Sequence, residues 1–286
     1  MSISFDRLRI QQECERLAGC NNLADWSNRR SVFEALTLTS PQSVALTPFL
    51  IEDGIDFYYK GLLSLCEAIY SMSRHLFSWA TVKAYYSIFY LLRSSLAANG
   101  YGIVRNKCLY LLPIKTGGKP IKKSSQRYSN DHCCVIHLYE DLYSKSDILQ
   151  SNTIDDINPY EWMMERRNQI NYRQRQFHDP GPPDFLQGIA QIMDSNSFDQ
   201  LISIYVDDTS YLYCFQPDHA CLALPIHRLL LTKAEYTDKG INLSTTEDRL
   251  NLITTLLTIG PNLIQRFQSF YLPVAEARTE ETNLAS

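Results

Sequence analysis

The sequence predicts a mainly α-helical protein, in which an antiparallel helical bundle is followed by a small α+β region at the C-terminal end. Two segments, residues 58–76 and 82–96, carry apolar residues at alternating spacings of four and three, which form one face of a helix. Adjacent helices with such faces pack as an antiparallel pair. After Phe185 the pattern changes to short apolar segments joined by polar turns, which is typical of strands.

Composition and charge limit the classes of protein to consider. The 286 residues are 45% hydrophobic and 20% charged, which is sufficient for a sizeable core in one large domain or two ordinary ones. A formal net charge of −4 argues against a protein that coats nucleic acid, so nucleic-acid contact must come from a local basic patch. The eight cysteines form no CxxC motif and no zinc-finger spacing, which favours reduced thiols over a structural zinc site.

The chain lacks the sequence features of export or membrane insertion. Its N-terminal residues contain no apolar segment of the kind found in signal peptides. No run reaches the roughly 18 consecutive apolar residues that suggest a membrane span. We therefore expect a cytoplasmic protein without membrane contact.

The chain divides into three predicted parts. Residues 1–54 form an N-terminal helical extension, with a short helix over 6–20 and a connector from Pro41 to Asp56. Residues 55–188 form the helical bundle, and residues 189–286 form the small α+β domain. The faces of the first two bundle helices consist of Tyr58, Leu62, Leu65, Ile69, Met72 and Leu76, and of Val82, Tyr85, Phe89, Leu92 and Leu96.

The bundle contains several further local signals. Gly61 costs helix stability and indicates a close helix–helix contact, and Asn99-Gly100 ends the second helix. Residues 101–130 are rich in glycine, proline and lysine, which predicts an exposed loop. A third helix is expected over 131–143.

The fourth helix has a well-defined start. Asn158 can cap it, Pro159 fits its first position, and the proline-rich segment after His178 ends it. The remaining expected elements are strands over 201–206 and 211–215, a strand or helix over 222–231, and a last helix from Thr245 to a break at Gly260-Pro261.

The basic end of this fourth helix is the candidate functional segment. Amides and one tyrosine alternate there with four arginines, Arg166, Arg167, Arg173 and Arg175, and His178 follows. Such a run is costly to bury. It indicates a solvated helix face paired with Glu161 and Glu165, a phosphate-binding face, or a metal-free catalytic site.

Helix geometry separates two of the candidate residues. Arg167 shares a face with Asn171, Gln174 and His178, whereas Tyr172 is five positions on and points roughly 140° away on a straight helix. Arg167 and Tyr172 act together only if the helix loosens near its end, or if a second subunit brings another copy alongside. The second arrangement favours a symmetric homodimer with the two motifs facing each other.

The residue types fit metal-independent cleavage of RNA, which needs no cofactor. Arginine would stabilise the developing phosphorane charge. Asn168 would orient a phosphate or a ribose hydroxyl, and Tyr172 or His178 would move the proton. The phosphate backbone of RNA could be followed by Arg166, Arg173 and Arg175, and by the loop residues Lys119, Lys122 and Lys123.

Other motifs are weak or absent. The run Lys115 to Lys119 lacks Walker A spacing, and no HExxH or GxSxG motif occurs. His132 and His137 lie on the expected helix over 131–143, where buried or capping roles are the prevailing interpretation.

Three segments resemble the HEPN superfamily of small helical domains. Residues 78–90, running on to Gly100, are similar to the family's A-Y-Y-x-x-F helix, and residues 167–172 are similar to its late arginine–polar motif. Residues 131–136 are similar to a histidine-bearing helix start found between them in some members. The likeness spans about residues 55–185. In members that cleave RNA a histidine follows the arginine by four to six positions, and here Tyr172 stands in that place, as in a variant branch.

The resemblance implies an effector of a bacterial antiphage or toxin–antitoxin system. Such proteins cleave or bind RNA as dimers and often pair with a nucleotidyltransferase or an ATPase. The alternative is a non-catalytic scaffold or adaptor subunit of a defence complex, whose fold serves as an assembly surface.

Overall fold

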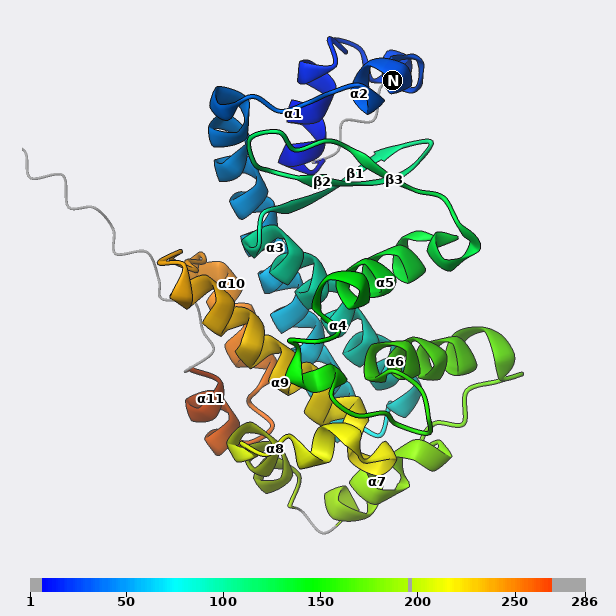
Figure 1. The fold of residues 1–286 in the computed structure, drawn as a ribbon. Helices are drawn as coiled ribbons and strands as arrows, with labels where there is room; N and C mark the ends of the chain where they lie inside the picture. The colour runs from blue at the N-terminus through cyan, green and yellow to red at the C-terminus, as the bar shows by residue number, and fades with distance from the viewer. Residues whose placement is uncertain (1–6, 195–196, 269–286) are drawn as a thin grey trace, which may run out of the picture.

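The computed structural model describes residues 7–194 and 197–268 (Figure 1). Within these ranges the protein has eleven α-helices and one small antiparallel sheet of three strands. The prediction of a mainly α-helical fold is confirmed. No helix in the described part of the chain is both long enough and apolar enough to cross a membrane.

A long helical hairpin forms the centre of the molecule. α3 (Ser40–Ser73) and α4 (Phe77–Ala98) lie side by side, and α9 (Pro217–Asp238) packs against both. The predicted close contact at Gly61 is confirmed, because a Cβ there would lie 2.6 Å from Leu91 Cγ. The predicted end of the second helix is confirmed as well, since α4 stops before Gly100, which has a φ of +81°.

The predicted connector over 41–56 is wrong, because these residues form the first half of α3. Thr39 caps the helix through a capping box with Gln42, and Pro41 stands in the first turn, where its missing N–H is not needed. Pro48 lies inside the helix, which continues because Leu46 and Leu50 on either side are buried.

The predicted loop over 101–130 is also partly wrong. Residues of this segment form β1 (Tyr101–Asn106), β2 (Cys108–Pro113) and β3 (Ile121–Lys123) in the order β1-β2-β3. Both faces of β2 are buried: Tyr110 and Leu112 lie in one core cluster, and Leu109 and Leu111 lie in another. The glycine pair at 117–118 lies in the β2–β3 turn. Backbone hydrogen bonds to Leu38 fix that turn, and a Cβ at Gly118 would clash with the Pro113 carbonyl.

The N-terminal helices cover one face of this sheet. α1 (Arg9–Leu17) confirms the expected short helix, and a 3₁₀ segment (Leu23–Arg29) with α2 (Arg30–Glu34) follows. Trp26 and Phe33 from these segments are buried with Tyr110 of β2 in a second, smaller core.

The third and fourth predicted helices are confirmed. α5 spans Asp131–Tyr143, after the 3₁₀ turn Gln126–Tyr128, and α6 spans Pro159–Asn168, after the 3₁₀ turn Ile148–Gln150. Asn158 caps α6 as expected, since its Oδ1 accepts from the Tyr160 N–H at 3.0 Å. A π-helical turn, Gln169–Arg173, ends the helix before His178.

All regular elements of the described C-terminal region are helices, so the strands predicted there are wrong. The strand expected over 201–206 lies in α8 (Phe198–Asp207), and the one over 211–215 becomes a 3₁₀ turn (Leu212–Phe215). Leu201, Ile202 and Tyr205 are buried at helical spacing, a pattern that β-branched composition concealed. The other elements are a 3₁₀ turn (Asp184–Leu186), α7 (Gln187–Asp194), α10 (Glu247–Leu256) and α11 (Pro261–Gln268).

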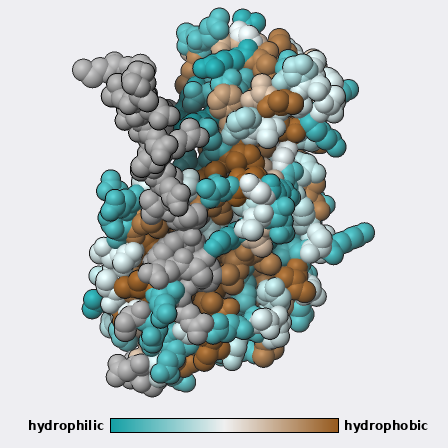
Figure 2. Space-filling model, turned by 90° about the vertical axis from the view of Figure 1, so that its left-hand side faces the viewer, coloured by the Kyte–Doolittle hydropathy of each residue, from teal (hydrophilic) through white to brown (hydrophobic). Residues whose placement is uncertain are grey.

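Two further expectations concern this region. The segment over 222–231, which fitted strand or helix, lies inside α9, and the expected break at Gly260-Pro261 separates α10 from α11. The large core contains residues from Tyr58 to Phe267, so the bundle and the C-terminal helices share it. On the face shown in Figure 2, hydrophobic and hydrophilic residues are interspersed in small areas.

Candidate functional site

A π-helical turn brings Arg167 and Tyr172 together within one chain. Gln174 N–H donates to the carbonyl of Gln169, five residues earlier, at 3.0 Å. This wider turn rotates Tyr172 back toward Arg167, and the guanidinium carbon lies 5.0 Å from the centroid of the tyrosine ring. Of the two arrangements expected for this pair, the structure contains the loosened helix end. Such π-turns often occur at functional sites.

Arg167 lies in an aromatic pocket on α4. Only 8% of the residue is exposed, and its guanidinium carbon is 5.7 Å from the Tyr85 ring and 5.8 Å from the Tyr86 ring. Nη2 donates to the Tyr86 hydroxyl at 3.3 Å, and Nη1 donates to Asn168 Oδ1 at 3.0 Å. The buried Nε has no hydrogen-bond partner among the residues that the structure describes.

No carboxylate pairs with Arg167 among residues 7–194 and 197–268. The two acids that could have formed a solvated ion pair are engaged elsewhere: Glu165 binds Arg173 at 2.8 Å, and Glu161 lies 3.3 Å from His137. Arg167 is therefore a desolvated cation surrounded by tyrosines. A charge in this setting attracts an anion strongly, because the low local dielectric strengthens the interaction.

His132, at the start of α5, completes the group. Its Nδ1 lies 2.8 Å from the Tyr85 hydroxyl, and its ring packs 4.7 Å from Phe89 and 5.7 Å from Tyr86, centroid to centroid. Burial, and next the positive charge of Arg167, lower the pKa of His132 below its ordinary value. The histidine is therefore neutral at pH 7, and Nε2 has no hydrogen-bond partner in the described part of the chain.

The sequence did not identify His132 as a site residue. The expected capping role belongs to Asn130, whose Oδ1 accepts from the Cys133 N–H at 3.0 Å. Only the likeness of residues 131–136 to a histidine-bearing helix start pointed to it. We refer to Tyr85, Tyr86, His132, Arg167, Asn168 and Tyr172 as the Arg167 cluster.

His178 lies away from this cluster. Its neighbours in sequence contact the N-terminal end of α4: Phe177 packs 5.6 Å from Trp79, and Asp179 Oδ1 accepts from the Ser78 N–H at 3.0 Å. Ser78 is seven residues before Tyr85, which is roughly 10 Å along a helix. The structure therefore brings Tyr172, but not His178, to Arg167.

The other basic residues that were predicted to bind nucleic acid are dispersed. Arg166 packs 4.8 Å from Trp162 and 5.5 Å from Phe185, so it is part of the protein's packing. Arg173 is exposed and pairs with Glu165, and Arg175 is exposed. Lys119 is exposed between β2 and β3 and Lys122 is exposed on β3, whereas Lys123 of the same strand pairs with Asp141 at 3.5 Å.

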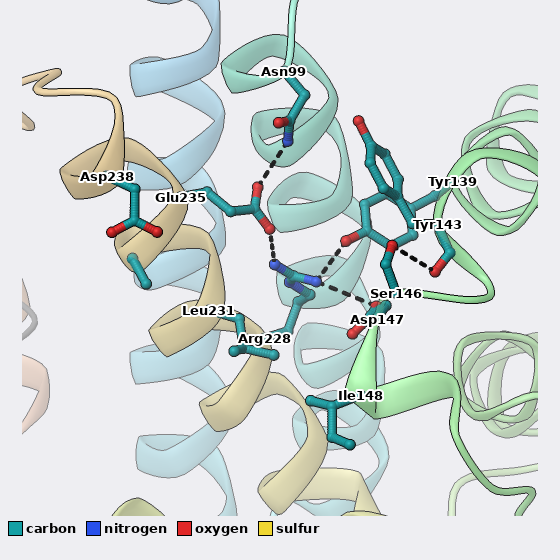
Figure 3. A pocket seen from close by; sticks show the side chains of 11 residues that line it. Asn99, Tyr139, Tyr143, Ser146, Asp147, Ile148, Arg228, Leu231, Glu235 and Asp238 are labelled. Atoms are coloured by element: carbon teal, nitrogen blue, oxygen red, sulfur yellow. Dashed lines mark hydrogen bonds and ion pairs between the residues drawn. The ribbon is translucent and has the colours of Figure 1, made fainter.

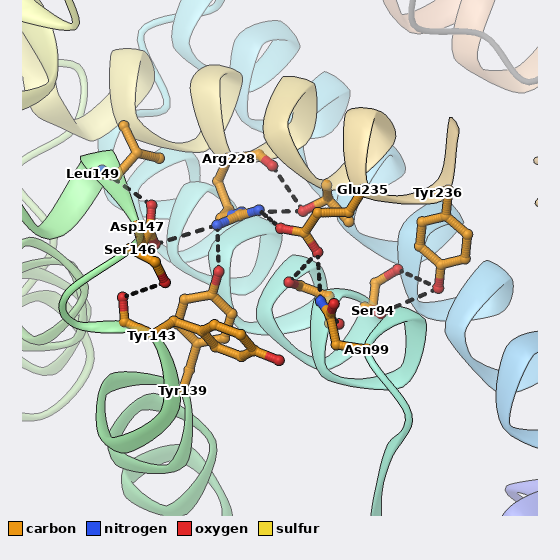
Figure 4. A network of polar contacts seen from close by, with 12 residues as sticks. Ser94, Asn99, Tyr139, Tyr143, Ser146, Asp147, Leu149, Arg228, Glu235 and Tyr236 are labelled. Carbon is orange, nitrogen blue, oxygen red and sulfur yellow. Dashed lines mark hydrogen bonds and ion pairs between the residues drawn. The ribbon is translucent and has the colours of Figure 1, made fainter. Parts of the chain in front are cut away.

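A second polar group, around Arg228, has a structural role. Its guanidinium bridges Asp147 at 3.3 Å and Glu235 at 2.5 Å, and Nη1 also donates to the Tyr139 hydroxyl at 2.6 Å (Figures 3 and 4). Nε donates to Thr232 Oγ1 at 3.1 Å. A pocket of about 310 Å³ adjoins this network. Every nitrogen of the guanidinium has a protein partner, so the group joins α9 to α5 and to the segment before α6.

One set of side chains has the composition of a metal site. The ligand atoms of His137, Glu140 and Glu161 all lie within 4.8 Å of one another. Arg127 already donates to Glu140 at 2.6 Å, and His137 lies 3.3 Å from each of the two glutamates. The Arg127–Glu140 ion pair and the contacts of His137 account for this arrangement.

The geometry of the Arg167 cluster is the main evidence on function. No protein-family model, curated protein or solved structure matches the chain.

Proposed function

We propose that the protein is a HEPN-like, metal-independent endoribonuclease whose active site is the Arg167 cluster. The observation that carries the proposal is a buried arginine without a carboxylate partner, held among three tyrosines and next to a neutral histidine. The cluster contains a cation, a base and a hydroxyl acid, which are the groups that cleavage of RNA by its own 2′-hydroxyl requires.

His132 would serve as the general base. With Nδ1 protonated, the ring donates to the Tyr85 oxygen at 2.8 Å, and Nε2 is left to accept a proton. Burial raises the pKa of Tyr85, so its hydroxyl stays protonated and serves to orient the ring. His132 then accepts the proton of the ribose 2′-hydroxyl as that oxygen attacks the adjacent phosphorus.

Arg167 and Tyr172 would act on the phosphate group and on the leaving 5′-oxygen. The Arg167 guanidinium can bind two non-bridging phosphate oxygens and stabilise the charge that grows on them. Tyr172, which is 69% exposed, would donate its proton to the departing 5′-oxygen. The products are a 2′,3′-cyclic phosphate and a free 5′-hydroxyl, and the proton taken by His132 is balanced by the one that Tyr172 gives.

The test compares purified variants on tRNA and total RNA, with folding checked by circular dichroism. We expect Arg167→Ala to lower the cleavage rate by about 10²–10³, the usual effect of removing one transition-state donor. His132→Gln and Tyr172→Phe should lower it as well. Arg74→Ala is the matched control, because Arg74 is an exposed arginine outside the Arg167 cluster and outside the basic segment. Intact RNA with the wild type, or equal cleavage by wild type and Arg167→Ala, would refute the proposal.

An exposed apolar area favours the second candidate function, a non-catalytic adaptor. Trp79 and Phe177, 50% and 44% exposed, pack on each other at the N-terminal end of α4, and Leu76 nearby is 44% exposed. Such an area marks a contact surface. It could also support the proposed symmetric dimer, in which the same surface faces its copy. Function that depends on Trp79→Ser but not on Arg167→Ala would favour the adaptor.

The cellular setting follows from the resemblance alone. On that basis we propose a cytoplasmic antiphage or toxin–antitoxin role with RNA as the target, and a nucleotidyltransferase or ATPase as partner. Toxicity of the wild type on expression in bacteria, lost with Arg167→Ala, would support this setting.

A further inference from the structure

A basic cleft lies beside the middle of the central hairpin, between α1, α3, α4 and β1. Its volume is about 590 Å³, within the range of small-molecule sites. The basic residues that line it are Arg7, Lys60, Arg93, Arg105 and Lys107, and the one acidic residue in the lining is Glu15. We call it the basic cleft.

The protein itself neutralises only part of this charge. Glu15 is bound by Arg7 at 2.8 Å, and Arg105 pairs with Asp131. Lys60, Arg93 and Lys107 form no ion pair within the described residues. Three cations thus converge on the cleft without counter-ions.

Arg93 is the most constrained of the three. Its guanidinium carbon lies 4.1 Å from the Phe57 ring, and its buried Nε has no hydrogen-bond partner in the described ranges of the chain. Burial lowers the pKa of Arg93 to about 10, so it stays protonated at neutral pH. The carboxylates that raise this pKa are occupied, Asp131 by Arg105 and Asp53 by backbone N–H groups at the start of α1. An anion in the cleft would pair with the guanidinium of Arg93.

Aromatic side chains accompany these cations. Phe57 stacks on Tyr90 with centroids 6.4 Å apart and planes at 15°, and Tyr90 stacks on Tyr86 at 5.9 Å and 28°. Trp26, with Phe57 and Tyr90, forms part of the lining. Cations beside aromatic rings bind the phosphates and the planar bases of nucleotides.

We propose that the basic cleft binds a nucleotide, with its phosphates at Lys60, Arg93 and Lys107 and its base against Tyr90. A cleft of this size exceeds what a single phosphate fills, and its apolar walls suit a planar base. The nucleotide is either free or the end of an RNA strand. The second source rests on the proposed function, because Tyr86 belongs to both the aromatic stack and the Arg167 cluster. Tyr86 is seven residues from Arg93, or roughly 10 Å along α4.

Calorimetric titration of the full chain with ATP, AMP and a 2′-O-methyl oligoribonucleotide, which cannot be cleaved, tests the proposal. We expect binding that Lys60→Glu and Arg93→Gln each weaken at least tenfold. Lys145→Glu is the matched control, because Lys145 is exposed beyond the far end of α5, roughly 20 Å from Asp131. Pyrophosphate is titrated as a ligand without a base. Tyr90→Ala should weaken the binding of AMP more than the binding of pyrophosphate, since only AMP carries a base.

The choice of ligand distinguishes a free nucleotide from the end of an RNA strand. Binding of ATP or AMP identifies a free nucleotide, and binding of the oligoribonucleotide alone identifies an RNA end. Binding of these ligands is measured without any cleavage of RNA, so a failure of the ribonuclease proposal is distinguishable from a failure here. The proposal is overturned if no nucleotide or oligonucleotide binds, or if Lys60→Glu and Arg93→Gln bind like wild type.

Discussion

Replacing Arg228 by alanine should be among the most destabilising single changes in this protein. Arg228 and Asp147 have side chains that are only 1% and 2% exposed, and the guanidinium forms the one ion pair of that carboxylate in the described chain. Removing one partner of a buried pair costs about 3–5 kcal/mol, because the other charge is left without compensation.

The local contacts place the expected loss at the lower end of this range. Asp147 keeps hydrogen bonds from the Tyr160 hydroxyl at 2.5 Å and from the Leu149 N–H at 3.0 Å. Glu235, whose side chain is 24% exposed, can be hydrated once Arg228 is gone. We therefore expect the free energy of unfolding to fall by about 3 kcal/mol, and Tm to fall by roughly 6–12 °C for a chain of this size.

Urea denaturation followed by circular dichroism measures this loss. Asp147→Asn in the Arg228→Ala background should recover part of it, because the second change removes the unpaired buried charge. Arg249→Ala is the matched control: its pair with Asp56, at 3.2 Å, joins side chains that are 41% and 42% exposed, and should contribute less than about 1 kcal/mol. Equal stability losses for Arg228→Ala and Arg249→Ala would show that the buried network is not the source of stability argued above.

Two further predictions concern packing and protonation. Gly61→Ala should destabilise the protein, because the overpacking cost of about 1–3 kcal/mol against the fully buried Leu91 exceeds the helix-propensity gain of up to about 1 kcal/mol; an unchanged or higher urea midpoint would contradict this. In NMR titrations, His132 should have a pKa below 6.5 that rises in Arg167→Ala, since the arginine's charge is the second cause of the lowering after burial. Because the folded-state pKa of His132 is the lower one, its contribution to stability is present above pH 6.5 and decreases as the pH falls toward that pKa. A His132 pKa that is unchanged in Arg167→Ala would show that the charge of Arg167 does not act on His132.

Helices with strong periodicity were predictable because their signals are local. The faces of α3 and α4, the cap at Asn158 and the stop at Gly100 depend on residues within a few positions of one another. The predictions of a connector over 41–56, a loop over 101–130 and strands after residue 200 were wrong, because the local composition there conflicts with the packing of the folded chain. Pro41 and Pro48 suggested a break that buried neighbours prevent, and isoleucine and valine in α8 suggested a strand.

The sequence by itself determined the helical class, and it identified Arg167, Asn168 and Tyr172 as the residues to examine. Only the tertiary structure decided which of them lie together. The π-helical turn, a departure of one residue from regular geometry, determines whether Tyr172 faces Arg167. His132 and Tyr85 are 47 residues apart in sequence and meet because α5 packs on α4. A local pattern can show which side chains share a helix face, but contacts between helices depend on how the whole core packs.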